Sequence, residues 1–287
     1  MSLSPDYDST KRIGTMKKIC FYSRPYPRVK SYYDMIDIAA QYGLNAFEGL
    51  SIWELSQPDI EEAKKIREYA DSKNVICPCL SAFVSFAHGK ENVDRLKKYA
   101  DIAKILGSPY LHHTIVGEFA DPLKVLPYKD ELFADGIHAV REVYDYAQSI
   151  GIKTIFEEQG YIFNGISGFG EFLGNVQRDV GVVADFANIY EAGDDFLDFL
   201  SAFKSRVVHA HIKDVTLSDT NPSGRGLRTL DGKFMFEARV GEGIVKFKEA
   251  IKILNDIGYD GYYALEYSAK ADNSPDITNA LNFIQSL

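Results

Sequence analysis

The chain has 287 residues, of which 46% are hydrophobic and 25% are charged, and its formal net charge is −9. An apolar share near the globular average of about 45–50% excludes bulk disorder, and no apolar run approaches the roughly 20 residues of a membrane span. The acidic balance argues against a nucleic-acid partner, because binding a phosphate backbone needs a basic patch. We therefore expect a protein with neither a nucleic-acid nor a membrane partner.

The N-terminus and the cysteines indicate where the folded domain begins and in which compartment it resides. Residues 1–15 contain no apolar segment of the kind that directs secretion, so we expect a disordered tail or an expression remnant there, with Met16 as a native start. Cys20, Cys77 and Cys79 are too few for a disulfide framework and are expected to be buried thiols. A reducing, cytoplasmic location fits this usage, with one catalytic domain over residues 16–287.

From Lys17 onward, short β-rich segments alternate with longer amphipathic ones. The predicted strands are residues 17–23, 44–49, 75–81, 109–116, 152–158, 180–186, 206–214 and 261–268. The predicted helices are residues 31–43, 59–74, 91–107, 129–151, 168–177, 194–203, 244–258 and 274–286. Apolar residues recur every three or four positions in the helices, whereas the strands are nearly continuous apolar runs, as in parallel sheets buried on both faces.

Glycines punctuate this alternation. Gly43, Gly107, Gly151 and Gly258 each follow a predicted helix and precede the next strand. A helix often ends in a left-handed residue, which glycine adopts without a steric penalty, so these positions support the predicted boundaries.

Eight strand–helix units predict a (β/α)8 TIM barrel, because eight parallel strands with right-handed crossovers can close on themselves. A doubly wound sheet is the alternative, but it usually carries a glycine-rich nucleotide turn after the first strand. Here the first strand continues into SRPYPR instead. The barrel is therefore the favoured fold.

One connection, between Asp214 and Ile244, is unusually long and follows the seventh predicted strand. Within it, Asp231-Gly232 is flanked by β-forming residues, which predicts a hairpin with a type I′ turn. Long loops in compact domains are often binding loops, so we expect this one to lie over the mouth of the barrel; a disordered insertion is the alternative.

Ionisable residues end four consecutive predicted strands. Glu157, Asp185, His211 and Glu266 occupy these positions, where barrel enzymes place their catalytic side chains. Carboxylates that lie this near to one another repel each other unless a cation is bound between them. Carboxylates with one imidazole suit Mn²⁺, Mg²⁺, Co²⁺ or Zn²⁺, and the lack of thiolates argues against a structural zinc site. We predict one divalent metal ion, with Mn²⁺ favoured.

Several segments resemble the xylose isomerase-like barrel superfamily of sugar phosphate isomerases and epimerases. The resemblance covers nearly the whole chain from residue 17. The segments are GIKTIFEEQG (151–160), GVVADFAN (181–188), HAHIKD (209–214), GYDGYYALEYS (258–268), GLNAFEG (43–49) and RVGEGIVKF (239–247). The resemblance implies the same four metal ligands.

The resemblance also implies a mechanism. Family members remove a proton from a carbon next to a carbonyl, through an enediolate that the metal stabilises. Glu157 and Glu266 would be both ligands and catalytic acid–base groups, whereas Asp185 and His211 would be ligands only. The predicted function is therefore a metal-dependent isomerase or epimerase of a sugar or keto-sugar.

Five further residues are candidates for substrate binding. Arg239 stands just before the G-x-G of RVGEGIVKF, and His113 ends the fourth predicted strand, with His112 expected to face the other way. Glu48 ends the second predicted strand, and Lys213 could orient His211 or close the rim. Asn188 replaces the histidine of the family's D-x-x-H segment, and this departure leaves the usual substrate pose open, as does Glu158 where Asn is common.

Alternative functions were weighed against these residues. An apurinic endonuclease needs more histidines than the six present, and the charge of −9 is against it. A dehydratase of an inosose-type keto-cyclitol would use the same ligands. A non-catalytic sugar-binding barrel is a third possibility, and it predicts that some of the four metal ligands are replaced. The expected partner is a small-molecule sugar, and the sequence leaves a dimeric or tetrameric homo-oligomer open.

Overall fold

The computed structural model describes residues 17–23, 29–84, 90–113, 115, 126–267 and 274–287. The predicted tail at residues 1–15 lies outside the described residues, and so do parts of the loops after the first, third, fourth and eighth strands of the barrel.

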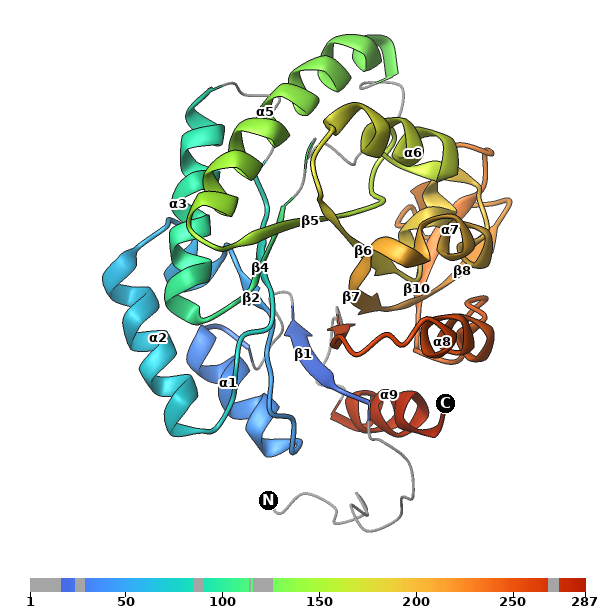
Figure 1. Ribbon diagram of the computed structural model, residues 1–287. Coiled ribbons are helices and arrows are strands. Elements are labelled where there is room, and N and C mark those ends of the chain that lie inside the picture. Colours follow the sequence, from blue (N-terminus) through green and yellow to red (C-terminus); the bar gives the residue numbers. More distant parts are fainter. Residues whose placement is uncertain (1–16, 24–28, 85–89, 114, 116–125, 268–273) are drawn as a thin grey trace.

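Eight parallel strands form the centre of the molecule and confirm the predicted TIM barrel (Figure 1). In spatial order they follow the chain around the barrel. They are β1 (Ile19–Ser23), β2 (Gly49–Leu50), β3 (Leu80–Ala82), β4 (Tyr110–His113), β5 (Lys153–Glu157), β6 (Gly181–Asp185), β7 (Val207–Ile212) and β11 (Tyr263–Tyr267). A parallel bridge between Phe21 and Phe47 joins β1 to the residues that precede β2, which completes the ring.

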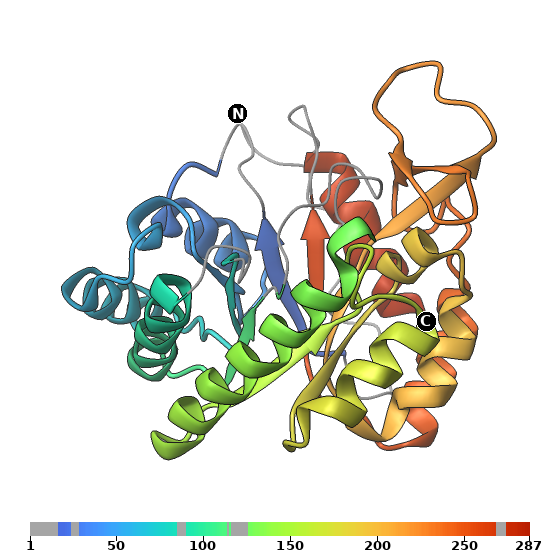
Figure 2. The same ribbon diagram turned by 90° about the horizontal axis from the view of Figure 1, so that it is seen from above.

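A helix follows each strand and packs outside the barrel (Figures 1 and 2). The helices are α1 (Tyr32–Gln41), α2 (Ile60–Ser72), α3 (Lys90–Leu106), α5 (Lys129–Ser149), α6 (Gly165–Val176), α7 (Phe196–Phe203), α8 (Phe247–Asp256) and α9 (Ser274–Ser286). The eight predicted strand–helix units are therefore all present.

Local chemistry sets the helix ends. The four glycines expected after helices, Gly43, Gly107, Gly151 and Gly258, all have positive φ angles, as predicted. Helix α6 begins at Gly165, earlier than the predicted residue 168, because the Asn164 side chain accepts a hydrogen bond from the Gly165 N–H at 2.7 Å and caps the helix.

Side chains alternate along each strand between two environments. On the outer face, residues such as Phe21, Phe156 and Leu265 pack into a large apolar core beneath the helices. Among the described residues, the inner face carries two small apolar clusters, one around Cys20 and Tyr22 and another around Ile155. The rest of the interior is polar, and that polar part is the candidate site.

The long connection after β7 is a small sheet (Figure 2). Strands β8 (Asp214–Ser218), β9 (Leu227–Arg228) and β10 (Phe234–Ala238) are antiparallel, in the order β8-β10-β9. The predicted hairpin is confirmed, but the prediction of a two-residue type I′ turn is wrong. Residues 229–233 separate the paired Arg228 and Phe234, because the Thr229 N–H bonds to the Lys233 carbonyl and forms a longer turn.

This three-stranded sheet contacts the loops after β5 and β6. The Tyr161 hydroxyl donates to the Arg228 carbonyl at 2.8 Å, and the Leu230 N–H donates to the Glu191 carbonyl at 2.8 Å. Both contacts lie at the carboxyl end of the barrel strands, so the sheet is fixed beside that end.

One carboxylate joins the two ends of the connection. Asp214 is buried and accepts hydrogen bonds at 2.8–3.2 Å from the backbone N–H groups of Val215, Gly241, Gly243 and Val245. A Cβ atom at Gly243 would lie 2.1 Å from an Asp214 oxygen, so this approach requires glycine. The D of HAHIKD and the G-x-G of RVGEGIVKF thus meet in one structural clamp.

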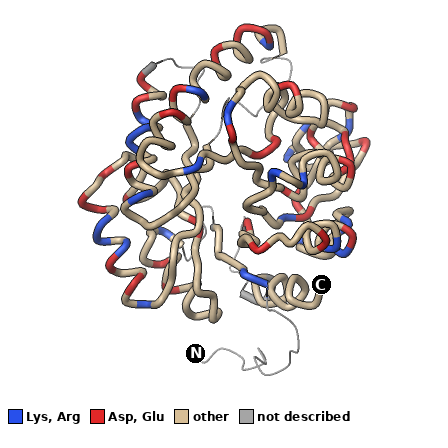
Figure 3. The backbone as a smooth tube through the Cα atoms, in the orientation of Figure 1, with Lys and Arg blue, Asp and Glu red and all other residues tan. Residues whose placement is uncertain are grey.

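Charged residues lie mostly on the outer helices. Figure 3 shows basic and acidic positions interspersed along α2 and α3, and pairs such as Lys64–Glu61 and Lys65–Glu62 are within 3 Å. Among the helices of the described residues, none is long and apolar enough to cross a membrane.

The Asp214 clamp can be tested by replacing its carboxylate with an amide. We expect Asp214→Asn to lower the free energy of unfolding by about 2–4 kcal/mol, because an amide leaves buried N–H donors unpaired. Urea unfolding measures this change, and limited proteolysis should show earlier cleavage within residues 219–243. Asp219→Asn, an exposed acid in the same connection, is the matched control, and equal behaviour of the two variants would contradict the clamp.

Candidate metal centre

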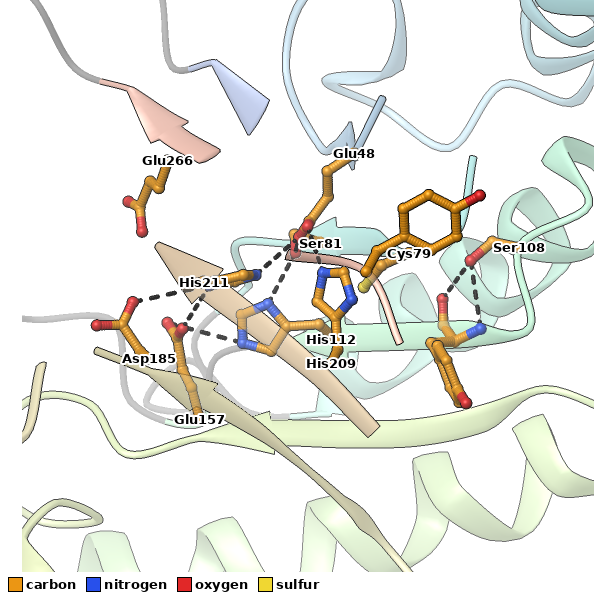
Figure 4. A network of polar contacts seen from close by, with 12 residues as sticks. Glu48, Cys79, Ser81, Ser108, His112, Glu157, Asp185, His209, His211 and Glu266 are labelled. Atoms are coloured by element: carbon orange, nitrogen blue, oxygen red, sulfur yellow. Dashed lines mark hydrogen bonds and ion pairs between the residues drawn. The ribbon is translucent and has the colours of Figure 1, made fainter. Parts of the chain in front are cut away.

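The four predicted metal ligands lie at the carboxyl end of neighbouring barrel strands (Figure 4). Glu157 ends β5, Asp185 ends β6, His211 is in β7 and Glu266 is in β11. Asp185 is in register with His211 across the β6–β7 pair. All four side chains are buried, although none of them is apolar.

Three of these residues meet closely. The His211 Nδ1 atom lies 2.9 Å from Glu157 Oε2 and 3.8 Å from Asp185 Oδ2. One donor atom from each of Glu157, Asp185 and His211 falls within 4.8 Å of the others, which is a spacing that one metal ion can span. The other oxygen of Asp185 accepts the N–H groups of Ala187 and Asn188, each at 2.8 Å, and this fixes the carboxylate.

Lys213 connects the fourth residue to this group. Its Nζ atom lies 3.0 Å from Asp185 Oδ2 and 3.2 Å from Glu266 Oε2. The structure therefore places the predicted residue Lys213 between two of the predicted ligands, with its ammonium group bridging β6 and β11.

The surrounding charges shift the pKa values of Glu157 and Asp185 in opposite directions. Burial opposes ionisation of Glu157, but His112, His211 and Lys213 outweigh it and lower the pKa of that carboxyl. Burial raises the pKa of Asp185, and Glu157 and Glu266 add to this effect against the attraction of Lys213. Glu157 is therefore the carboxylate that these side chains hold ionised.

A second set of polar residues lies deeper in the barrel, next to His211. Glu48 is fully buried, and its oxygens are 2.7 Å from His209 Nε2 and 3.1 Å from His211 Nε2. The Ser81 hydroxyl donates to Glu48 and lies 2.8 Å from His112 Nδ1. Figure 4 shows these side chains pointing toward one another inside the barrel.

The orientation predicted for the two histidines of β4 is wrong. His112 faces the interior, 3.7 Å from Glu157 Oε1. His113 faces the helices, where its ring packs edge-on against Phe156 at 4.6 Å between centroids. The reason is the strand alternation: Leu111 packs in the outer core, and a residue two positions later shares its face.

The other predicted substrate residues lie in different surroundings. Asn188 is buried, its carbonyl accepts from Asn164 Nδ2 at 2.8 Å, and its own Nδ2 atom has no hydrogen-bond partner in the structure. Arg239 is exposed and directly follows β10. Substrate binding by Arg239, Asn188, Lys213 and Glu48 stays a prediction.

Sequence reasoning assigned no role to His209, Ser81, His112 or Glu191. The H-A-H spacing of HAHIKD was the available signal for His209, since residues two apart on a strand share a face. Glu191 carried no such signal, because it lies in the short helix η4 (Asn188–Ala192) after β6. Burial raises the pKa of Glu191 to about 8, and one oxygen accepts the Gly160 N–H at 3.0 Å.

The residues at the carboxyl end fit a divalent cation. Glu157, Asp185 and His211 supply two carboxylates and one imidazole, which suit Mn²⁺, Mg²⁺, Co²⁺ or Zn²⁺. Asp185 Oδ2 is buried and accepts no hydrogen bond, so it retains capacity for a cation beyond its ion pair with Lys213. Glu266 lies across the Lys213 ammonium from this group and completes the predicted set.

Comparison with known proteins agrees with this fold. Residues 36–287 match the family described as xylose isomerase-like TIM barrel, and the chain belongs to that family.

Individual relatives are similar to this chain at low identity. An inosose dehydratase of Clostridium perfringens is 23% identical over 259 residues, which cover 85% of this chain and 84% of that protein. The apo structure of a 3-keto-D-glucoside 4-epimerase from E. coli is 12% identical, with a TM-score of 0.72 over 94% of this chain and 100% of the other. A xylose isomerase-like TIM barrel protein from Mycobacterium smegmatis in complex with magnesium is 16% identical, with a TM-score of 0.67 over 95% and 96%. The structural likenesses show the fold.

Glu191 provides a pH test of these buried acids. Its pKa of about 8 in the folded protein exceeds its ordinary value of 4.5, so the unfolded chain loses this proton at lower pH than the folded one. The free energy of unfolding should therefore fall as pH rises through this window, by up to about 1.4 kcal/mol per pH unit from this group. We expect Glu191→Gln in chelator-treated protein to gain stability relative to the unsubstituted chain between about pH 5 and about pH 8. Urea unfolding at several pH values measures the difference, and parallel curves would contradict it.

Proposed function

We propose that the protein is a divalent-metal-dependent isomerase or epimerase of a sugar or keto-sugar, which removes a proton from a carbon next to a carbonyl. The observation that carries this proposal is the meeting of Glu157, Asp185 and His211 within 4.8 Å, with Glu266 joined to them through Lys213. The similarity to a keto-sugar epimerase and to inosose dehydratases supports the class of substrate.

The four predicted ligands would hold the cation. When bound, a divalent cation supplies Lewis-acid stabilisation of the negative charge that develops on oxygen as the proton leaves. Mn²⁺ remains the favoured ion, and Mg²⁺, Co²⁺ and Zn²⁺ suit the same donors.

The chain's own residues divide the proton transfer. Glu157 is held ionised by His112, His211 and Lys213, so its carboxylate can accept a proton at neutral pH. Glu266 stands on β11, three strands away from β5, which carries Glu157, with β7 and β6 between them, so the two acids approach the site from different sides. One carboxylate would remove the proton. Return of a proton by the other acid, in its protonated form, would invert the carbon, whereas return by the same group to the neighbouring carbon would move the carbonyl.

Dehydration of a keto-cyclitol is the second candidate, favoured by the inosose dehydratase relatives. Its first step is the same proton abstraction, but a hydroxyl must then leave. The Lys213 ammonium, which lies 3.2 Å from Glu266, would be the group that protonates such a hydroxyl. The two candidates therefore differ in the fate of the carbon that carries the leaving group.

Metal binding is the first test. We expect one tightly bound divalent ion per chain, because the four predicted ligands form one site, and we expect its loss in Glu266→Gln and His211→Ala. Elemental analysis of protein purified without chelator and Mn²⁺ titration measure this. A chain that holds no metal and binds no Mn²⁺ would overturn the mechanism.

A screen in D₂O with Mn²⁺ separates the candidate reactions. Ketoses, aldoses, their phosphates and inososes serve as substrates, and mass spectrometry reads the products. An isomerase or epimerase gives an isomer that carries solvent deuterium next to the carbonyl, whereas a dehydratase gives a product lighter by one water. Glu157→Gln should slow the reaction by about 10²–10⁴-fold, because it removes the proton acceptor. Undiminished exchange in Glu157→Gln would exclude Glu157 as the base.

A further inference from the structure

Glu48 belongs to a closed ring of buried polar contacts. The ring is formed by Glu48, Ser81, His112, Glu157 and His211. From Glu48 one arm runs directly to His211 Nε2 at 3.1 Å. The other runs through Ser81 to His112, whose Nε2 atom lies 3.7 Å from Glu157 Oε1. The ring closes where His211 Nδ1 lies 2.9 Å from Glu157 Oε2. The two arms thus reach two of the predicted metal ligands.

The ionised Glu48 carboxylate sets the direction of every hydrogen bond around it. A carboxylate only accepts, so the Nε2 atoms of His209 and His211 and the Ser81 hydroxyl must all donate to Glu48. Because the single Ser81 proton is used in this way, the Ser81 oxygen accepts from His112 Nδ1. The hydrogen bond from His211 Nε2 can persist when Nδ1 gives its lone pair to a cation, whereas the bond from Nδ1 to Glu157 cannot.

We infer that Glu48 is a positioning residue for the metal centre, which holds His211 with Nε2–H toward the barrel core and Nδ1 toward Glu157 and Asp185. The inference rests on the proposed function, since it concerns the same cation. In metal sites, a carboxylate that accepts the second N–H of a ligating histidine fixes the ring and raises the basicity of the ligand. Glu48 occupies that position here, and His209 holds Glu48 in turn at 2.7 Å.

The surroundings of Glu48 argue against direct contact with substrate. The side chain is fully buried, and both of its oxygens are engaged by side chains of β3 and β7. A purely structural role predicts an effect on folding alone. A positioning role predicts an effect on metal affinity in protein that remains folded.

The experiment compares Glu48→Gln with a matched buried acid. The amide has the same size but presents an N–H₂ group to donors, so it cannot accept all three hydrogen bonds. We expect Mn²⁺ affinity, measured by isothermal titration calorimetry at neutral pH, to fall by about 10–100-fold. Glu191→Gln is the control: Glu191 is equally an internal acid, its pKa of about 8 keeps it protonated at neutral pH, and we expect unchanged Mn²⁺ affinity.

A measurement on the unsubstituted chain keeps the inference testable if Glu48→Gln does not fold. With diamagnetic Mg²⁺ or Zn²⁺ bound, side-chain ¹⁵N chemical shifts should show His211 protonated at Nε2 and not at Nδ1. Protonation at Nδ1 would overturn the inference, as would equal Mn²⁺ affinity of folded Glu48→Gln and the unsubstituted chain. Failure of the unsubstituted chain to bind any divalent ion would instead overturn the proposed function.

Discussion

The structure depends on how buried negative charge is compensated inside the barrel. Glu48, Glu157, Asp185 and Glu266 are all buried within one end of a parallel barrel, an environment in which an isolated carboxylate is costly. Each lies against a cationic or hydrogen-bonding partner: Glu48 against two histidines, Asp185 and Glu266 against Lys213, and Glu157 against His211. The two histidines of β7 that pair with these acids, His209 and His211, accordingly both face the interior.

The strand alternation makes this arrangement possible. Apolar residues such as Phe21 and Phe156 on the outer face pack beneath the helices. The stability of the fold therefore does not depend on an apolar interior at the carboxyl end of the barrel strands. The inner face is then available for ionisable groups, whose cost is met by mutual pairing. The buried Asp214 carboxylate is compensated in a similar way, by hydrogen bonds from four backbone N–H groups. These bonds fix the sheet that follows β7 beside the site.

The sequence predicted much of the fold because the barrel repeats one local pattern eight times. Helical periodicity and the glycines after helices located the units, and the strand ends located Glu157, Asp185, His211 and Glu266. The orientation of His112 and His113 could not be predicted from a short strand, since both residues are polar and a shift of one position exchanges the two faces. Glu48 looked like a rim residue, because nothing local to GLNAFEG shows that Ser81 and His209 surround it; those contacts span 33 and 161 positions of the chain. Long-range pairing of this kind is set by the closed barrel and not by any segment alone.

The charges also bear on the valence of the cation. Glu157, Asp185 and Glu266, when ionised, carry three negative charges, and the Lys213 ammonium between Asp185 and Glu266 removes one of them. Glu48 lies outside this group, where its oxygens contact His209 and His211. The remaining charge of minus two at a neutral His211 ligand is cancelled by one divalent ion, whereas a monovalent ion would leave a buried negative charge without compensation. A second divalent ion would exceed the charge of these three carboxylates, which supports the proposal of a single metal ion held by the four predicted ligands.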